Sequence, residues 1–405
     1  MSIEKKPSRF ALKLILTPIR TFLESRSEIV VEKNDTLTMK PPYIILSNHV
    51  TNWDMFLLNC YVKDPICFVA SDSLFRHPLL KRVLNYAGAI PKTKFKNDAS
   101  TIRAIMKAKK NKRAIAIFPE GNRNWDGSTE PIIYTTAKLV KSLKIPVVVA
   151  TISGGYLSHP RWADYHRKGK ISISLTKVWD EEELANETPK SIDEKLALAL
   201  GHDEVKWQHD KGYAYQGKAL AEHIERLLFI CPHCKEIGEM RSNQDLVDCQ
   251  SCAYKVRYTP YGTFEQVEKP VTFATPRDWH QWQLSYMEKT IDSGNLSQSW
   301  QGAMKDHVKL YVSEERQPFQ FVSSGTLSVV DDNMSFQADK GGNHSFELEH
   351  IEGLNVQLHH KLDFYYHNKM YRAIFYRPET SAYKWLKTIQ LLGLSENKKV
   401  REKVE

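Results

Sequence analysis

The sequence predicts an α/β domain, then a small metal-binding module, then a mostly-β roll closed by a terminal helix. Three observations indicate this order. Short apolar runs alternate with longer helical patterns over residues 27–228. Four cysteines stand in two pairs within residues 229–258. Strand-like runs separated by turn residues fill residues 300–395 and end in a helical pattern.

The strands predicted for the first domain are short, unbroken apolar runs of the kind that a sheet covered on both faces requires. Helical patterns lie between them, so we expect a mixed sheet flanked by helices, with the site on loops that follow strands. A last run alternates cleanly and suits an edge strand. The predicted strands are 43–47, 66–70, 89–91, 114–118, 145–152 and the edge strand 171–175; the predicted helices are 73–86, 99–110 and 137–143.

Composition bounds the class of protein. The chain has 405 residues with 41% hydrophobic and 26% charged content, which fits two or three ordinary globular domains. The net charge of +9 suggests an anionic partner, which could be a nucleic acid, a membrane surface or a phosphorylated substrate. Cys60 and Cys67 stand in apolar surroundings and are interpreted as buried thiols, so we expect a reducing, cytoplasmic compartment.

An amphipathic helix is predicted near the N-terminus, within residues 1–26. No apolar run reaches the ~20 residues that a spanning helix needs, because Lys13, Pro18 and Arg20 interrupt the longest one. The apolar face of this helix either lies on a membrane or covers the sheet. Both interpretations stay open.

A polar turn follows the first apolar strand. His49 and Asp54 are separated by four residues, which on one continuous helix would place them roughly 140° apart. They can meet only if His49 stays in the turn while Asp54 falls in the first helical turn. The carboxylate then fixes the imidazole tautomer and raises its basicity, which suits removal of a proton from a hydroxyl. The same spacing recurs at His159 and Asp164, where a surface loop explains it.

A second polar turn follows the strand that ends at Phe118. It contains Glu120, Gly121 and Arg123. Glycine permits a backbone conformation that other residues avoid, and arginine offers a planar fork of donors suited to phosphate. Taken alone, a solvated salt bridge in a loop explains this turn as well.

Together, the His-four-residues-Asp block and the Phe-Pro-Glu-Gly-x-Arg block resemble those of the lysophospholipid acyltransferase family, 1-acyl-glycerol-3-phosphate acyltransferase type, over residues 20–175. The resemblance implies that His49 is the general base and that Asp54 orients it. It also implies that Glu120, Gly121 and Arg123 bind the glycerol phosphate of the acceptor, and that the N-terminal helix docks on a bilayer.

The sequence departs from the family pattern in several places. Where the family usually has an arginine after a glycine, this chain offers only Lys92 and Lys94 as phosphate contacts. Val149 replaces the second proline that usually flanks the fourth block, and Asn122 stands where threonine or valine is common. These departures leave the identity of the acceptor open.

Two Cys-x-x-Cys pairs with fourteen residues between them match the spacing of a zinc ribbon. Four thiolates fill a tetrahedral site and leave no position for catalysis, so the predicted role of zinc is structural. A redox role and nucleic-acid binding are weaker alternatives. The predicted ligands are Cys231, Cys234, Cys249 and Cys252.

The C-terminal region has many short strands and one final helix, at 381–392, which resembles a pleckstrin-homology-type roll. The predicted strands include 319–322 and 325–330. Such a module could bind lipid headgroups, a membrane surface or a protein, or could only stabilise the chain.

The leading hypothesis is an acyltransferase that moves a fatty acyl group from acyl-CoA or acyl carrier protein to lysophosphatidic acid, on the cytoplasmic face of a membrane and without a nucleic-acid partner. Another lysophospholipid or glycerol-3-phosphate is an alternative acceptor. A hydrolase lacks a Gly-x-Ser-x-Gly nucleophile turn here. A non-catalytic lipid-binding zinc-ribbon adaptor is the alternative from a different class.

Overall fold

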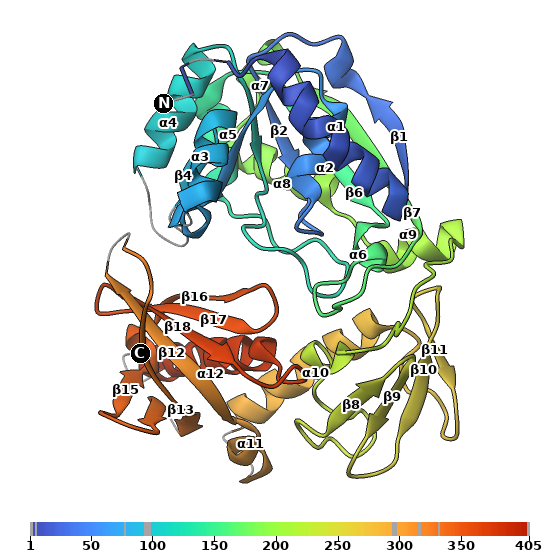
Figure 1. Cartoon of the computed structure of the whole chain (residues 1–405), viewed down its shortest axis with the longest axis vertical. Helices are drawn as coiled ribbons and strands as arrows, with labels where there is room; N and C mark the ends of the chain where they lie inside the picture. The colour runs from blue at the N-terminus through green and yellow to red at the C-terminus, as the bar shows by residue number, and fades with distance from the viewer. Residues whose placement is uncertain are drawn as a thin grey trace. The chain divides into compact units, whose positions relative to one another are not determined.

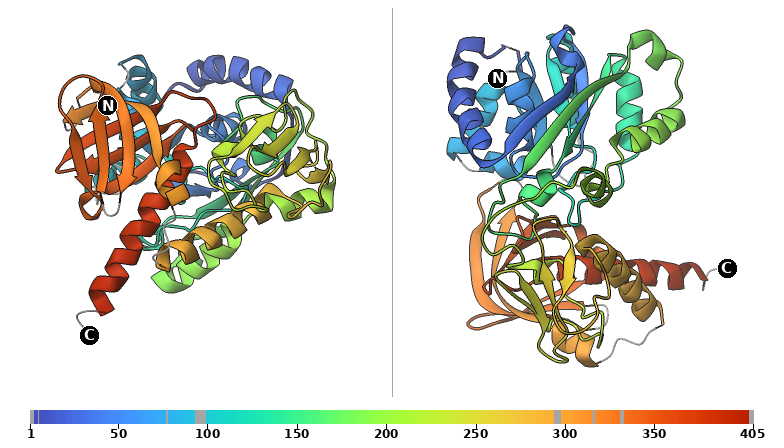
Figure 2. Two further views of the ribbon diagram at one scale, coloured as in Figure 1. Left: turned by 90° about the horizontal axis from the view of Figure 1, so that it is seen from below. Right: turned by 90° about the vertical axis from the view of Figure 1, so that its right-hand side faces the viewer.

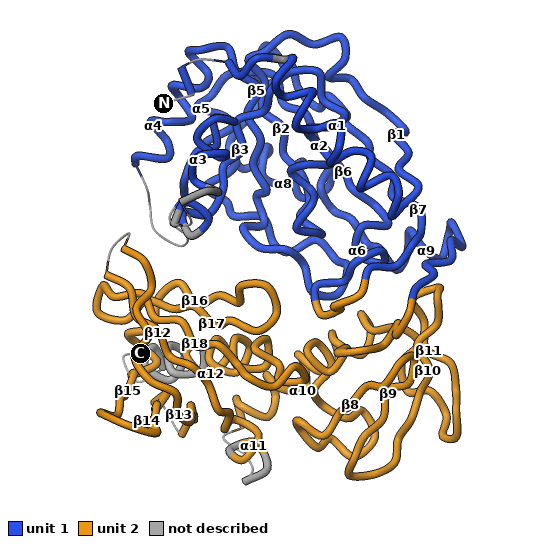
Figure 3. The backbone as a smooth tube through the Cα atoms, viewed as in Figure 1, with its two compact units in different colours: residues 1–161, 166–217 blue, residues 162–165, 218–405 orange. Residues whose placement is uncertain are grey.

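The computed structural model describes residues 3–4, 6–76, 78–92, 99–293, 298–314, 317–330 and 333–402. The chain forms two compact units (Figure 3). Unit 1 comprises residues 1–161 and 166–217, and unit 2 comprises residues 162–165 and 218–405. Residues 218–228, which the sequence analysis assigned to the first domain, therefore lie in unit 2.

Unit 1 is built on a seven-stranded sheet (Figure 1). Its strand order is β1-β7-β6-β2-β5-β3-β4. All neighbouring pairs are parallel except β6 with β7, so the sheet is mixed, as predicted. The strands are β1 (Glu28–Asn34), β2 (Tyr43–Ser47), β3 (Ile66–Ser71), β4 (Ile90–Lys92), β5 (Ala114–Ile117), β6 (Val147–Ser153) and β7 (Lys170–Trp179).

Helices cover both faces of this sheet, which the right-hand view of Figure 2 shows edge-on. Successive residues of β2 alternate between two cores: Ile44 packs on one face and Ile45 on the other. The core of Ile45 includes α1 and α2, and the core of Ile44 includes α4, α5, α7 and α8. The helices are α1 (Arg9–Arg26), α2 (Asp54–Tyr61), α3 (Pro78–Ala87), α4 (Ala99–Lys110), α5 (Thr135–Leu143), α6 (Gly155–Ser158), α7 (Glu181–Ala185), α8 (Pro189–Leu200) and α9 (Glu204–Lys211), with 3-10 turns η1 (Asp35–Leu37) and η2 (Asp72–Arg76).

The sequence was wrong about the edge of the sheet. It predicted an edge strand at 171–175, but β7 lies between β1 and β6. The reason is β1, which contains charged residues at Glu28, Glu32 and Lys33, pairs in parallel with β7 and covers its outer side. The alternation of residues in β7 arises although the strand is internal.

Unit 2 contains two antiparallel sheets joined by a long helix (Figure 1). The smaller sheet has the order β11-β10-β9-β8, and the larger has the order β15-β14-β13-β12-β18-β17-β16, with α12 packed against β16 and β17. This β half-barrel with a terminal helix matches the predicted fold class. The elements are η3 (Ile224–Arg226), β8 (Met240–Asn243), β9 (Leu246–Cys249), β10 (Lys255–Tyr258), β11 (Phe264–Gln266), α10 (Pro276–Asp292), α11 (Gln298–Ala303), β12 (Lys305–Glu314), β13 (Gln320–Val330), β14 (Asn333–Ala338), β15 (His344–Glu347), η4 (Leu348–His350), β16 (Glu352–Gln357), β17 (Lys361–Tyr366), β18 (Lys369–Phe375) and α12 (Ala382–Glu402).

Two predicted strands, 319–322 and 325–330, are one continuous strand, β13. Gly325, the first residue of the second predicted strand, lies inside β13. A Cβ atom at Gly325 would lie 2.2 Å from the backbone oxygen of Gln337, so the close approach of β14 requires glycine in the middle of a strand. The predicted final helix, 381–392, begins at Ala382 and continues to Glu402.

Helix α1 is amphipathic and lies against unit 1 on one side only. Leu23 is buried in the core, whereas Phe10 and Leu14 are 73% and 62% exposed. The helix therefore covers the sheet and also presents apolar side chains outward. Among the helices that the structure describes, none has the length and the apolar character to cross a bilayer.

Candidate active site

The turn between β2 and α2 is anchored by Asn48, a residue that the sequence analysis did not select. Its amide nitrogen donates to the backbone oxygen of Ile152 at 2.9 Å, and its oxygen accepts from the backbone nitrogen of Ile152 at 2.8 Å. These two hydrogen bonds resemble those between neighbouring strands, so they continue the pairing of β2 with β6 beyond the end of β2. The turn that carries His49 is thereby fixed to the centre of the sheet.

His49 and Asp54 meet in the geometry that the sequence required. Helix α2 begins at Asp54, His49 stays in the turn, and His49 Nδ1 lies 2.8 Å from Asp54 Oδ2. The Asp54 carboxylate is fully buried and also accepts hydrogen bonds from the backbone of Val50 and from the backbone and hydroxyl of Thr51. The carboxylate is thus held rigidly, and it orients the imidazole.

The His49 ring packs face to face on Phe118, with ring centroids 4.3 Å apart and an angle of 20° between the planes. The histidine side chain keeps 25% of its surface exposed. Phe118 comes from the end of β5, so the second motif supplies the surface that supports the imidazole. A ring held by Asp54 at Nδ1 and by Phe118 on one face has little freedom to rotate.

The second turn, after β5, holds Glu120 below the surface. One of its carboxylate oxygens accepts from the backbone nitrogen of His49 at 2.7 Å and the other from that of Glu130 at 2.8 Å. Burial raises the pKa of Glu120 to about 8, while the two backbone N–H groups act in the opposite direction. Gly121 has a φ of +73°, which explains glycine there.

Arg123 is the most informative cation of the site. Its residue is 9% exposed, and its guanidinium makes no hydrogen bond or ion pair with any residue that the structure describes. Burial lowers the pKa of Arg123 to about 10, and the nearby charge of Asp54 acts against this decrease. A buried guanidinium without a partner carries five unused N–H donors and therefore favours an anionic ligand.

The two lysines proposed as phosphate contacts differ in position. Lys92 ends β4, and since β2, β5, β3 and β4 are parallel neighbours, it lies at the same edge of the sheet as His49. Three strand spacings separate β4 from β2, roughly 14 Å. Lys94 lies outside the described residues.

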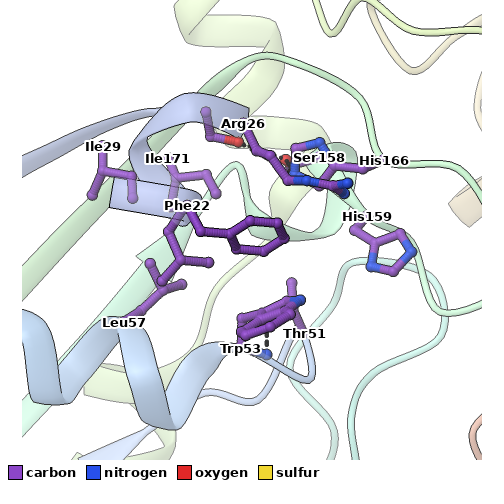
Figure 4. Close-up of a pocket in the computed structure, with 12 residues that line it drawn as sticks. Phe22, Arg26, Ile29, Thr51, Trp53, Leu57, Ser158, His159, His166 and Ile171 are labelled. Carbon is purple, nitrogen blue, oxygen red and sulfur yellow. Dashed lines mark hydrogen bonds between the residues drawn. The ribbon is translucent and has the colours of Figure 1, made fainter. Parts of the chain in front are cut away.

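A pocket lies beside the turn between β2 and α2 in unit 1 (Figure 4). One wall is apolar and includes Phe22 of α1 and Trp53, whose ring centroids are 5.3 Å apart. The other wall carries Ser158, whose hydroxyl lies 3.0 Å from His166 Nε2. Thr51, which also lines the pocket, connects it to the Asp54 carboxylate.

The second His-four-residues-Asp pair serves a different purpose. Asp164 hydrogen-bonds the buried Arg226 at 2.7 Å and lies 3.2 Å from His223, all within unit 2. Burial opposes a charge on His223, but hydrogen bonds to Asp164 and Glu225 outweigh it and raise the pKa of His223 to about 9. Asp164 is thus part of a salt-bridge cluster inside unit 2, and it is more than the plain surface loop expected.

The four predicted zinc ligands converge in unit 2. All four sulfur atoms lie within 4.8 Å of one another, and the Cys231–Cys252 and Cys234–Cys249 sulfur pairs are each 3.7 Å apart. Tetrahedral zinc with Zn–S bonds of about 2.3 Å requires sulfur atoms about 3.8 Å apart. The residues present therefore fit a structural zinc ion.

Each cysteine pair adopts the same tight turn. The backbone nitrogen of Lys235 donates to Cys231 O, and that of Ala253 donates to Cys249 O, at 3.0 and 3.1 Å. Lys235 and Ala253 both have positive φ values, 66° and 56°. Two matching turns of this kind bring the four sulfur atoms to a common point.

Comparison with known proteins shows what part of unit 1 is similar to. Residues 28–153 match the family model described as Acyltransferase. The chain is 26% identical over 175 residues to a 1-acyl-sn-glycerol-3-phosphate acyltransferase of Saccharomyces cerevisiae, covering 42% of this chain and 56% of that protein. It is 30% identical over 104 residues to a protein of the same name from Borreliella burgdorferi, covering 25% of this chain and 42% of that protein.

The chain thus spans about half the length of the curated relatives it matches. A solved structure, the 1-acyl-sn-glycerophosphate (LPA) acyltransferase PlsC from Thermotoga maritima, overlaps 47% of this chain and 77% of its own chain, with 20% identity and a TM-score of 0.42. The resemblance predicted from the two sequence blocks is confirmed by the family model and the two sequence relatives.

Proposed function

Residues 28–153 form a domain of the acyltransferase family, and on this premise we propose that the protein transfers a fatty acyl group to the free hydroxyl of lysophosphatidic acid. The names of the two sequence relatives support this acceptor. The product would be phosphatidic acid, and the donor a thioester of coenzyme A or acyl carrier protein.

His49 is the proposed general base. With Nδ1 held by Asp54, Nε2 is the nitrogen that takes the proton from the acceptor hydroxyl. The hydroxyl oxygen attacks the thioester carbonyl, the C–S bond breaks, and the departing thiolate receives the proton from His49. Direct transfer needs no acyl-enzyme, because neither turn places a serine or cysteine next to the imidazole in the sequence.

The observation that carries this proposal is the Arg123 guanidinium. It is buried and has no partner among the described residues, and it lies close enough to Asp54 to feel its charge. A phosphate monoester would satisfy these donors and fix the acceptor so that its hydroxyl reaches His49. Gly121 lets the turn approach the phosphate, and Lys92 could add a second cation from the end of β4.

The proposal is tested by following a labelled acyl thioester mixed with lysophosphatidic acid and the purified chain. We expect labelled phosphatidic acid to form. Free fatty acid as the only product would assign the pair to hydrolysis. Binding of lysophosphatidic acid without turnover would favour the non-catalytic lipid-binding adaptor. Two departures from the family pattern support that alternative: Val149 replaces a proline, and Lys92 and Lys94 stand where an arginine is usual.

Arg123→Ala is expected to raise the KM for lysophosphatidic acid by about 10- to 150-fold, since hydrogen bonds to charged groups contribute roughly 1.5–3 kcal/mol. Monoacylglycerol, which lacks the phosphate, should be acylated equally by the wild type and the variant. Arg103→Ala, at an exposed position of α4, is the matched control. An equal loss with both acceptors would show that Arg123 does not read the phosphate.

We also propose that α1 docks the protein on the cytoplasmic face of a membrane. Its exposed Phe10 and Leu14 support this location, as do the basic residues of the same helix. In flotation with vesicles that contain phosphatidylglycerol, the double variant Phe10→Ser, Leu14→Ser should bind at least about 100-fold more weakly, because each of the two side chains contributes ~1.5 kcal/mol or more on burial.

Leu198→Ser provides the control for flotation, because Leu198 is 82% exposed on α8 in the same unit. It should float like the wild type. Equal flotation of the wild type and the α1 variant would remove the proposal for α1.

The four cysteines are proposed to hold a structural zinc ion. Four thiolates complete its coordination, so the ion would stabilise the fold of the ribbon and supply no reactive position. The C-terminal β half-barrel has no assigned ligand in this proposal.

A further inference from the structure

Glu120 is a buried residue whose two carboxyl oxygens both accept hydrogen bonds from main-chain groups. Oε1 accepts from the backbone nitrogen of His49 at 2.7 Å, and Oε2 accepts from the backbone nitrogen of Glu130 at 2.8 Å. The residue is only 6% exposed. Both of its oxygens are therefore directed at main-chain N–H groups, one of which belongs to the proposed general base.

The loop that contains Glu120 holds the His49 peptide from both ends. Glu120 binds the N–H of His49, and the backbone nitrogen of Asn124 donates to the His49 carbonyl oxygen at 3.0 Å. Asp54 separately holds the imidazole at 2.8 Å. The position of His49 Nε2 thus depends on the second turn as much as on its own turn.

The chemistry of the acceptor argues against a direct contact between Glu120 and phosphate. A carboxyl group offers a phosphate no N–H donor, and both oxygens of Glu120 already accept hydrogen bonds from main-chain N–H groups. The donors for phosphate are on Arg123, three residues later in the same loop. One short loop therefore combines a ligand for the substrate with a support for the base.

We propose that Glu120 is a positioning residue: it fixes the His49 main chain relative to the Arg123 guanidinium and contacts neither substrate. This inference rests on the acyltransferase function proposed above. It changes the role that the family resemblance implied for Glu120, which was binding of the acceptor.

The two roles predict different kinetics. A displacement of the base by about 1 Å can cost roughly 10²-fold in rate, without altering how the phosphate is bound. Glu120→Gln keeps the shape and one acceptor but turns an amide N–H toward a backbone donor. We expect it to lower kcat by about 10- to 100-fold and to leave the KM for lysophosphatidic acid within about threefold.

Glu204→Gln is the matched control. Glu204 is also a buried glutamate of unit 1, and it accepts from the backbone of Leu157 at 3.4 Å and pairs with His202 at 2.6 Å, away from His49. It should leave kcat within about threefold. A large rise in KM for Glu120→Gln with kcat unchanged would overturn the positioning role and restore the binding role.

A second measurement does not depend on turnover. Amide hydrogen exchange of the full chain, resolved to single residues, should accelerate at both His49 and Glu130 in Glu120→Ala, and at one or both in Glu120→Gln. Neither Glu204→Gln nor Arg123→Ala should produce this pattern. Unchanged protection at His49 in both Glu120 variants would contradict the proposal. If the wild type transfers no acyl group, exchange still tests the support of His49, so the two failures remain distinct.

Discussion

Replacing His49 with alanine is expected to lower kcat/KM for acyl transfer to lysophosphatidic acid by about 10²- to 10⁴-fold, the usual contribution of a general base. The side chain is partly exposed, and its main contacts are Asp54 and the face of Phe118. Folding should therefore be preserved, and the loss should appear in kcat. The measurement is steady-state kinetics with labelled acyl thioester.

Asp54→Asn is also expected to lower activity, and it does so for two reasons. The new amide places N–H donors opposite the backbone donors of Val50 and Thr51, so the turn loses roughly 1–3 kcal/mol of stability. It also favours the wrong tautomer of His49, which removes the base from Nε2. Activity should fall by about 10²-fold or more at temperatures where the variant remains folded.

His209→Ala is the control for the loss of a histidine. The His209 side chain is 87% exposed on α9 in the same unit. Its substitution should leave kcat/KM within about threefold of the wild type. Full activity of His49→Ala would show that the imidazole is not the base and would contradict the proposed mechanism of acyl transfer.

Removing the proposed zinc ion should unfold the ribbon. Structural zinc contributes about 10–16 kcal/mol in small zinc-dependent folds, which is as large as the whole stability of an ordinary domain. The β8–β11 sheet is small, with strands of three or four residues, and its buried side chains Tyr254 and Phe264 pack on Trp279 of α10. Cys231→Ser or a strong chelator should abolish protection of residues 240–266 in hydrogen exchange.

The sheet of unit 1 should keep its protection under the same treatment, because the cysteine cluster lies wholly in unit 2. Cys60→Ser, at a half-buried thiol of unit 1, is the matched control and should not alter the ribbon. Metal analysis should find about one zinc per freshly purified chain. A substantially lower content, or an unchanged ribbon in Cys231→Ser, would contradict the zinc proposal.

Short stretches of the sequence were sufficient to predict the features that depend on residues close together in the chain. The buried strands around β2 and β5 are continuous apolar runs, and no neighbour is needed to recognise them. Helix periodicity alone showed where His49 and Asp54 must lie in order to meet, and the second sequence block supported the pair. The cysteine spacing likewise predicted a cluster of four sulfur atoms before any contact was known.

Local sequence patterns could not predict which strands pair when they lie far apart in the chain. The sequence suggested an edge strand at 171–175, since alternation is typical of a strand with one solvated face. The structure covers that strand with β1, which lies about 140 residues earlier in the chain. Gly325 was similarly ambiguous: a glycine can end a strand or permit a close neighbour, and only the position of β14 distinguishes the two.

By itself, the sequence determined the α/β class, the pairing of His49 with Asp54, the arginine-bearing turn and the cluster of four cysteines, because each depends on residues that are close in the chain. Tertiary structure alone decided that Glu120 faces the His49 peptide, that Arg123 is buried with no partner among the residues that the structure describes, and that Asp164 pairs with Arg226. The physical reason is that burial and hydrogen-bond partners are set by segments far apart in sequence, which pack only when the whole sheet and its helices have formed.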